Sequence, residues 1–287
     1  MKRNTKKPDA ILTADWHLRE DTPVCRIDDF EKTLWRKVRF IADLQKTYDV
    51  NVYHAGDLFH HWKPSPRLLS LCIRYLPKKF YTVYGNHDLP QHSMQLKEKS
   101  GVNTLAEAKI IEIIAGAGNW NEIPRPIIHG NKKIGLWHKL VYAGKTPFPG
   151  IDESALANKV LRKHKEFDLL ITGDNHKSFI CRDGNRLLVN PGCITRQRVG
   201  DQDDPCVYLW YADTNTVKEV FLPVDYKAVD NDHLKRKEER EERIDAFITK
   251  LNTDNMLSIN FVENLRIFEA SNSINSNVMQ IVYNSLD

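Results

Sequence analysis

Five short motifs carry side chains of the kinds that bind metal ions. They are TADWH (residues 13–17), HAGDLFHHW (54–62), YGNHD (84–88), LWH (136–138) and TGDNH (172–176). Their carboxylate, amide and imidazole groups, without a thiol, suit Mn²⁺, Fe²⁺, Mg²⁺ or Zn²⁺. Seven groups, enough for two ions that share one carboxylate, are Asp15, His17, Asp57, Asn86, His138, Asp174 and His176. Two divalent ions about 3.5 to 4 Å apart can hold a phosphate and lower the pKa of an attacking water molecule.

Each motif lies at the end of a predicted strand or just after it. Short apolar runs predict strands at residues 10–14, 50–55, 80–85, 133–138 and 168–172. Amphipathic runs predict helices at 30–44, with Asp28 as N-cap, at 66–76 and near 153–165. This alternation is typical of a largely parallel sheet, whose carboxyl strand ends share one edge, so the motifs should converge there. From residue 178 onward, close-set strands and the turn at Asp183-Gly184 predict a second, more antiparallel sheet.

The order of the motifs, D-x-H, G-D, G-N-H-D, H and G-x-x-H, resembles the calcineurin-like metallophosphoesterase superfamily over residues 10 to about 195. Within it, GDLFHHWKPSPRLL and the NPGC turn at 190–193 are similar to the DNA-repair nuclease branch, the SbcD-type subunit. The resemblance implies an α/β fold, a two-sheet β-sandwich flanked by helices (αββα). It also implies two divalent metal ions, Mn²⁺ first, with Mg²⁺, Fe²⁺ or Zn²⁺ as alternatives.

Carried over position by position, the resemblance implies a role for each site residue. Asp15, His17 and His176 would hold one ion, Asn86, His138 and Asp174 the second, and Asp57 would bridge them. His87 would face the scissile phosphate with Asp88 orienting it, and His60 would help to position the phosphodiester. The superfamily usually has a histidine where this chain has Asp174. A carboxylate can replace an imidazole on a hard ion, so we expect the second site to be kept; the alternative is its loss.

Composition excludes several classes of protein. The 287 residues are 41% hydrophobic and 28% charged, which is typical of a folded chain. No run approaches the roughly 18 apolar residues of a membrane span, and the basic start has no apolar signal-peptide core. The five cysteines form no C-x-x-C pair, so we expect reduced thiols in a cytoplasmic protein without a membrane partner. No G-x-x-x-x-G-K-[ST] loop is present, so we do not expect ATP hydrolysis.

The chain is predicted to divide near residue 225. Residues 1–225 contain every motif, form the predicted phosphoesterase domain and hold the basic excess behind the net charge of +4. Residues 226–287 are acidic overall and favour helices, one of which has Val262, Leu265 and Phe268 on one face. We expect a small helical C-terminal extension. Its apolar faces either pack within the protein or dock a partner, for which the resemblance suggests an SbcC-type ATPase or a second copy of the chain.

The favoured function is a Mn²⁺-dependent phosphodiesterase that acts on DNA as an exonuclease or endonuclease. The basic balance of the larger part of the chain suits a polyanion. Two alternatives stay open. One is the same chemistry on a small phosphoester or a phosphoprotein. The other is a non-catalytic scaffold subunit with an incomplete metal site, which only the carboxylate of Asp174 supports.

Overall fold

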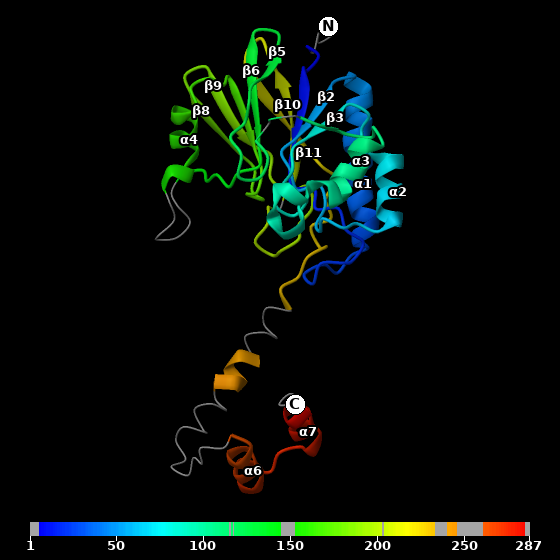
Figure 1. The fold of residues 1–287 in the computed structure, drawn as a ribbon, viewed down its shortest axis with the longest axis vertical. Helices are drawn as coiled ribbons and strands as arrows, with labels where there is room; N and C mark the ends of the chain where they lie inside the picture. The colour runs from blue at the N-terminus through cyan, green and yellow to red at the C-terminus, as the bar shows by residue number, and fades with distance from the viewer. Residues whose placement is uncertain are drawn as a thin grey trace. The chain divides into compact units, whose positions relative to one another are not determined.

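The computed structural model describes residues 6–114, 116, 118–144, 153–202, 204–232, 240–245 and 261–284. The chain divides into two compact units, residues 1–230 and 231–287, each considered by itself. Every motif lies in the first unit, whose strands are numbered β1 to β11 and whose helices are numbered α1 to α4. Most of these labels appear in Figure 1.

The first unit contains two mixed β-sheets. The larger, in the order β11-β10-β1-β2-β3-β4, is made of β1 (Ala10–Thr13), β2 (Asn51–His54), β3 (Phe80–Thr82), β4 (Glu112–Ile113), β10 (Cys206–Tyr211) and β11 (Thr216–Phe221). The smaller, in the order β5-β6-β7-β9-β8, is made of β5 (Ile127–His129), β6 (Lys132–Trp137), β7 (Leu169–Thr172), β8 (Phe179–Asp183) and β9 (Arg186–Asn190). Strands β1 to β4 are parallel, and so are β6, β7 and β9, so the strands that carry the motifs run the same way within each sheet.

The strands after residue 178 do not form a sheet of their own, so that prediction was wrong. Strands β8 and β9 make the expected hairpin around Gly184, but β9 lies parallel to β7 and joins the second sheet. Strands β10 and β11 extend the first sheet, with β10 antiparallel to β1. Local turn signals identify a hairpin but not the strand on which it docks, because that choice depends on long-range packing.

Helices cover the outer face of each sheet, as Figure 1 shows. Helices α1 (Phe30–Tyr48), α2 (Pro66–Tyr75) and α3 (Gly101–Glu107) lie on the first sheet, and α4 (Ala157–Lys163) lies on the second. Short 3-10 turns occupy Pro90–His92, Met94–Lys99 and Glu153–Ala155. The N-cap of α1 is Asp29 and not the predicted Asp28, because Asp29 accepts the Lys32 amide whereas Asp28 pairs with Arg26.

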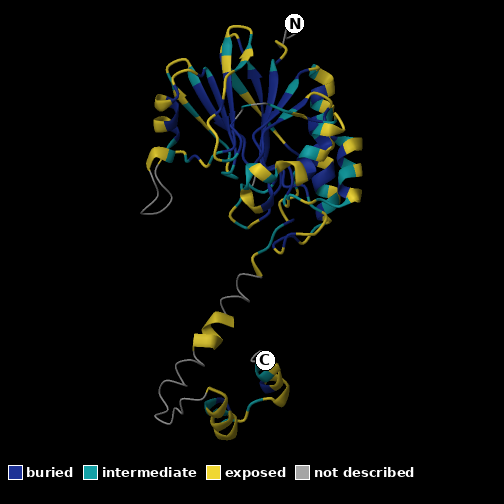
Figure 2. Ribbon diagram, viewed as in Figure 1, coloured by how far each residue is buried: buried dark blue, intermediate teal, exposed yellow. Residues whose placement is uncertain are grey.

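Three apolar layers hold these parts together. The first, with Ile11 and Phe30, lies between the first sheet and its helices. The second, with Leu12 and Ile134, lies between the two sheets, and the third, with Leu170, lies between the second sheet and α4. Neighbouring residues of β1 face different layers, so Ala10, Ile11 and Leu12 are all apolar and the whole strand is buried, as Figure 2 shows in dark blue. The predicted α/β fold, two sheets between helical layers, is confirmed.

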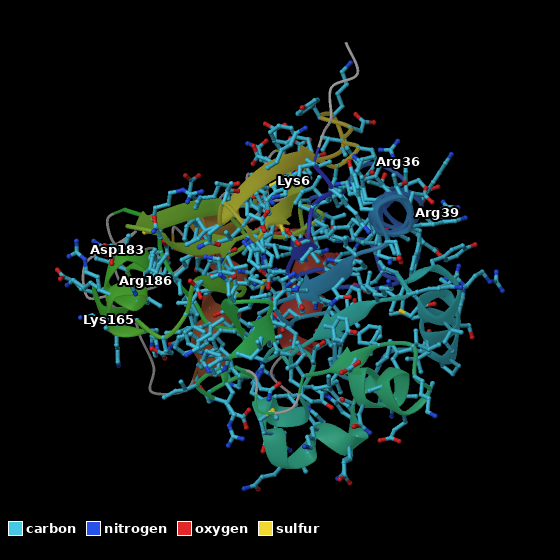
Figure 3. All side chains as sticks on the ribbon, turned by 90° about the horizontal axis from the view of Figure 1, so that it is seen from above. Lys6, Arg36, Arg39, Lys165, Asp183 and Arg186 are labelled. Atoms are coloured by element: carbon cyan, nitrogen blue, oxygen red, sulfur yellow. The ribbon has the colours of Figure 1, made fainter. Side chains whose placement is uncertain are left out.

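The two helical layers lie on opposite sides of the first unit. In the view of Figure 3, Arg36 and Arg39 project from α1 on one side, and Lys165, Asp183 and Arg186 lie beside α4 on the other. Charged side chains thus cover both outer surfaces while the sheets are enclosed. No helix in the described part of the chain has both the length and the apolar character that a membrane span requires.

The first unit extends to Asp230, five residues beyond the predicted boundary. Ala228 is buried and its carbonyl oxygen accepts the Ile27 amide at 3.0 Å. The Asp230 amide donates to the Cys25 carbonyl oxygen, also at 3.0 Å. Residues 226–230 therefore pack with the first unit, because their backbone is hydrogen-bonded to the loop before α1.

The second unit is helical where the structure describes it. It contains a helical stretch at residues 240–245, α6 (Phe261–Ser271) and α7 (Ser276–Asn284). Residues 233–239 and 246–260, which belong to the segment predicted to be helical, lie outside the described residues. Leu265 and Met279 are buried, whereas Val278 and Ile281 are exposed. That this segment docks a partner stays a prediction.

Candidate metal centre

The predicted ligands follow five strands of the two sheets. They come after β1, β2 and β3 of the first sheet and after β6 and β7 of the second. In chain order they are Asp15, His17, Asp57, Asn86, His138, Asp174 and His176. Contacts of 4.0 Å or less connect all seven, so the structure brings the whole predicted set together.

Four of these residues have a left-handed backbone. The φ angles are 50° at Asp15, 45° at His17, 56° at Asp57 and 71° at Asp174. Residues with a Cβ rarely adopt this conformation, which persists where the surrounding structure enforces it. Here the His17 amide donates to the Asp57 carbonyl oxygen at 3.0 Å, and the Asp174 amide donates to the Asp15 carboxylate at 3.0 Å. Backbone strain is thus present at four of the predicted ligands.

A glycine precedes three of the ligands because the packing leaves no room for a side chain. A Cβ on Gly56 would lie 2.5 Å from the His138 ring, and one on Gly85 would lie 2.0 Å from the Asp57 carboxylate. A Cβ on Gly173 would lie 2.4 Å from a backbone oxygen. Real Cβ atoms do not approach other atoms this closely, so the glycines allow the strand ends to meet.

One cluster joins Asp15, His17, Asp57 and His176. The Nε2 atoms of His17 and His176 are 3.0 Å apart, and His17 Nε2 lies 3.6 Å from Asp57 Oδ2. Asp15, His17 and Asp57 are almost completely buried and present ligand atoms close enough for one ion. Two imidazole nitrogens that face each other beside a carboxylate match the way histidines surround a divalent ion. This is the set that the sequence assigned to the first ion.

The second cluster is centred on His138. Its Nδ1–H donates to the Ala55 carbonyl oxygen at 2.8 Å, so the lone pair of the neutral ring is on Nε2. That Nε2 atom faces Asn86 Oδ1 at 3.0 Å, Asp57 Oδ2 at 3.5 Å and Asp174 Oδ1 at 3.9 Å. Asp57 Oδ2 therefore lies close to the histidines of both clusters, the position expected of a bridging ligand.

Buried carboxylates make the site short of positive charge. Burial raises the pKa of Asp57 well above its ordinary range, and it raises that of Asp15 although His176 and His138 offset part of the effect. Burial opposes protonation of His138, but the carboxylates of Asp57, Asp15 and Asp174 outweigh it and raise its pKa to about 9. Divalent cations would supply the missing charge.

An unpaired oxygen supports the fit of metal ions. Asp15 Oδ2 is buried and has no hydrogen-bond partner among the described residues. Buried polar atoms are nearly always paired, so this oxygen is an exception that a bound ion or water would explain. The buried His/Asp clusters, with oxygen and imidazole donors, are consistent with a site for two metal ions.

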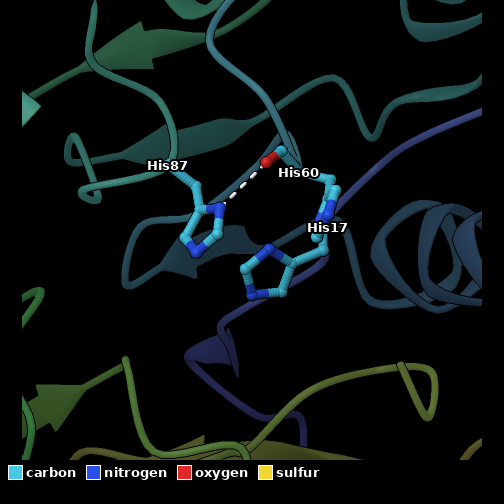
Figure 4. A group of neighbouring side chains, drawn as sticks. All are labelled: His17, His60 and His87. Carbon is cyan, nitrogen blue, oxygen red and sulfur yellow. Dashed lines mark hydrogen bonds between the residues drawn. The ribbon is translucent and has the colours of Figure 1, made fainter. Parts of the chain in front are cut away.

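His87 lies outside the two clusters that share Asp57, but with His17 and His60 it forms a further group whose ring nitrogens are close enough to hold an ion. Its Nδ1–H donates to the His60 backbone carbonyl oxygen at 2.8 Å, as Figure 4 shows. The His60 ring stacks on the His87 ring with centroids 5.4 Å apart, and the His17 ring meets it edge-on at 4.9 Å. Burial lowers the pKa of His87, and burial together with Arg19 lowers that of His60 to about 4. Both rings are therefore mainly neutral at pH 7.

Asp88 does not contact the His87 ring, contrary to the role implied by the resemblance. Its buried carboxylate accepts the backbone amides of Leu58 at 3.3 Å, Phe59 at 3.0 Å and Gly85 at 3.0 Å. Asp88 thus joins the loop after β2 to the loop after β3. The ring of His87 is oriented by a backbone carbonyl instead.

Two supporting groups were not predicted. Asp201 accepts a hydrogen bond from His176 Nδ1 at 3.1 Å and holds its own position by accepting the amides of Gln197 and Arg198. The Ala55 carbonyl oxygen does the same for His138. Such partners fix the ring orientation that presents Nε2 to a metal ion. Asp201 lies in a loop with no motif spacing to reveal it, and a backbone carbonyl has no signature in a sequence.

A cavity of about 260 Å³ lies at the clusters. It is lined by Asp57, His87, Asp174 and His176, together with the exposed cations Lys177 and Arg198. Cations that adjoin a metal-binding cluster favour an anionic ligand such as a phosphate ester.

Comparison with known families identifies the superfamily of the first unit. Residues 10–215 match the calcineurin-like phosphoesterase superfamily domain. The chain belongs to this superfamily. The matched region contains every predicted ligand, and the second unit lies outside it.

Relatives within the superfamily are distant. The chain is 32% identical over 127 residues to a probable metallophosphoesterase of Methanocaldococcus jannaschii, and the alignment spans 43% of this chain and 62% of the archaeal protein. A solved archaeal phosphodiesterase is similar over 74% of this chain and 99% of its own, with 17% identity and a TM-score of 0.45. A zinc complex of Vps29 from Entamoeba histolytica is similar over 76% and 99%, with 19% identity and a TM-score of 0.38. None of these is described as an SbcD-type nuclease, so that narrower resemblance stays a prediction.

Proposed function

We propose that this protein is a two-metal phosphodiesterase. One observation supports the proposal most strongly. The seven predicted ligands lie close together in two clusters that share Asp57, and the His87 imidazole lies beside them. Divalent ions held there would bind the phosphate and lower the pKa of the attacking water. Mn²⁺ is our first choice, because the second cluster has oxygen ligands from Asp57, Asn86 and Asp174 and one imidazole.

The neighbouring histidines suit an alkyl phosphoester as substrate. The alkoxide that leaves such an ester is strongly basic and needs a proton, which the imidazolium form of a histidine within reach would supply. Because burial lowers the pKa of His87, this protonated form is the minority at pH 7. The His60 carbonyl holds Nδ1 of His87, so the other ring nitrogen is the one that can exchange a proton with substrate. Arg198 and Lys177 line the same cavity and would attract the anionic ester.

DNA is the narrower candidate substrate. It is supported by the GDLFHHWKPS and NPGC segments, which resemble the SbcD-type branch, and by the cations at the cavity, which suit a polyanion. The relatives named above support only phosphoester chemistry in general. Small diesters are therefore the first substrates to test, and DNA the second.

The position of Asp174 argues against a non-catalytic scaffold. That alternative requires an incomplete second site, yet Asp174 Oδ1 lies 3.9 Å from His138 Nε2 and the Asp174 amide is bonded to Asp15. The proximity of the Asp174 oxygen to His138 supports its role as a ligand, although Asp174 is the chief departure from the family pattern.

An assay with added Mn²⁺ tests the proposal. We expect hydrolysis of bis(p-nitrophenyl) phosphate to exceed that of p-nitrophenyl phosphate, and EDTA to abolish both. Single-stranded DNA, duplex ends and a phosphoserine peptide, assayed in parallel, distinguish the substrate classes. Faster turnover of the monoester or the peptide would favour the alternative phosphatase function. A protein that binds two ions and hydrolyses none of these substrates would favour the scaffold.

A further inference from the structure

A second cavity adjoins the metal centre. Its volume is about 430 Å³, within the size range of sites that hold small organic ligands. His138 and Asp174 line it, and Asp174 and Leu140 line the cavity at the clusters as well. A substrate whose phosphate binds at the clusters can therefore extend into this second cavity.

Aromatic rings and ammonium groups define the chemistry of the cavity. Its lining includes Trp120, Trp137, Lys139 and Lys163. Trp137 is only 7% exposed, and the Lys139 ammonium lies 4.9 Å from the centre of its ring. Trp120 is half-buried and is thus the ring more accessible to a ligand, with its centroid 6.0 Å from that of His138.

The loop that carries Trp120 is fixed to the metal centre. The Trp120 amide donates to the Tyr84 carbonyl oxygen at 2.9 Å, and the Tyr84 amide donates to Asn119 Oδ1 at 2.9 Å. The Asn119 side chain also donates a hydrogen bond to the carboxylate of Glu122, another residue of the cavity lining, at 2.6 Å. The His138 amide bonds to the start of the same loop at 2.7 Å. Trp120 is therefore held in place relative to the loops that carry Asn86 and His138.

We propose that this cavity binds a nucleoside next to the scissile phosphate, with its base against Trp120 and a further phosphate at Lys139 and Lys163. The inference rests on the proposed phosphodiesterase function and narrows its substrate class to nucleotides or nucleic acid. Bases of every kind stack on tryptophan, and lysine binds phosphate as a point charge. A phosphoserine peptide has neither a ring to stack nor a second phosphate, so it would use neither feature.

Calorimetric titration of the full chain with Mn²⁺ present tests the stacking. The two probes are 2′-deoxyadenosine 5′-monophosphate and inorganic phosphate. We expect Trp120→Leu to weaken the affinity for the nucleotide by about tenfold and to leave the affinity for inorganic phosphate nearly unchanged. Trp120→Phe should bind both probes with affinities within about threefold of wild type. Three results would overturn the proposal. Trp120→Leu could bind the nucleotide as tightly as wild type, it could lose as much affinity for inorganic phosphate as for the nucleotide, or the Phe and Leu variants could lose equal affinity for the nucleotide.

Substitution of two lysines on α4 tests the proposed site for the further phosphate without changing a buried residue. The probe is 2′-deoxyadenosine 3′,5′-bisphosphate, which has no diester to hydrolyse. We expect wild type to bind it several-fold more tightly than the monophosphate, and Lys163→Ala to abolish that preference. Lys159→Ala, on the same helix but paired with Glu153 and absent from the cavity lining, is the matched control and should retain it. Equal effects of the two substitutions would reject the flanking site.

Turnover of bis(p-nitrophenyl) phosphate by the same proteins separates the two proposals. Binding of the nucleotide that depends on Trp120, without any turnover, would reject the phosphodiesterase and keep the nucleoside site. If the diester is hydrolysed but nucleotide affinity does not change when Trp120 is substituted, the nucleoside site is rejected and the phosphodiesterase function is kept.

Discussion

His87 contacts the first ligand cluster through the His17 ring and the loop after β2 through the His60 carbonyl, but it belongs to neither cluster. His87→Ala should therefore leave the binding of both ions near wild type and lower kcat by about 10²- to 10⁴-fold, because proton transfer to the leaving oxygen is lost. Metal content and steady-state kinetics of the variant check this. A variant that purifies with one ion fewer would identify His87 as a ligand.

Asp174 tests whether the second ion is held as proposed. Asp174→Ala removes one oxygen from the His138 cluster, so the Mn²⁺ concentration needed for half-maximal rate should rise by about tenfold or more while the first ion is retained. Asp174→His restores the usual residue of the superfamily and should stay active. Rate against Mn²⁺ concentration for the three proteins decides the matter. Coincident curves for wild type and Asp174→Ala would show that this carboxylate binds no ion.

His138 should make metal binding depend on pH. Its folded-state pKa of about 9 lies above the ordinary value of 6.5, so the metal-free ring is protonated at pH 7 and an ion must displace that proton. The same proton stabilises the metal-free fold below pH 6.5, and this contribution is lost as the pH rises through about 9. We expect the affinity of the second ion to fall by about tenfold per unit from pH 8.5 to 7. Calorimetry in buffers of different ionisation enthalpy measures the released proton, and constant affinity over this range would contradict the assignment.

At the scale of elements, the turn after β7 depends on a glycine. In Gly173→Ala the new Cβ would meet the Ala55 carbonyl oxygen, which also orients His138. We expect a loss of about 1 to 3 kcal/mol, a fall in Tm of roughly 2 to 4 °C per kcal/mol, and weaker binding of the second ion. Gly200→Ala is the matched control, because nothing lies within 4 Å of a Cβ there. Equal melting temperatures for the two variants would show that the turn can relax.

The strands that deliver ligands were predictable, whereas the assembly of the later strands was not. Runs such as those at 10–14 and 168–172 are apolar on both faces and short, which is a strong local signal for a buried strand. The pairing of β10 with β1 joins segments almost 200 residues apart, and no local pattern encodes it. Strand β5 has only three residues, Ile127–His129, so its apolar run was too short to predict a strand.

The site shows the same division between local and long-range information. Metal-binding side chains can be recognised by type and by position after a strand, and the structure brings all seven together. The supporting contacts could not be recognised. Asp88 accepts hydrogen bonds from backbone amides and not from the His87 ring. Asp201 accepts a hydrogen bond from His176, which lies 25 residues earlier in the chain. Both depend on how loops fold back, which motif spacing does not describe.

For the whole molecule, the apolar core of the first unit should make it independent of the second. Its three core clusters, among the described residues, lie between Ala10 and Leu222. A chain that ends at Asp230 should therefore keep the melting temperature and diesterase rate of the full chain. A chain that ends at residue 225 is the matched control, and it should be less stable because it lacks the bonds of Ala228 and Asp230 to the loop before α1. An insoluble protein ending at Asp230 would show that the helical extension is part of the core.

The same pair of chains tests the predicted partner role of the extension. Light scattering during gel filtration reports whether the full chain forms a dimer that the chain ending at Asp230 does not. Equal masses would reject self-association through residues 231–287 and leave a different protein as the predicted partner.

Each proposed ion takes ligands from both sheets. Asp15, Asp57 and Asn86 follow strands of the first sheet, and His138, Asp174 and His176 follow β6 and β7 of the second. The sheets otherwise meet through an apolar layer, whose contacts are not directional and permit small sliding movements. Metal binding would therefore join the sheets mechanically. Amide hydrogen exchange should slow together at the ends of β1, β2, β6 and β7 when Mn²⁺ is added, and the two halves should open as one cooperative unit instead of two.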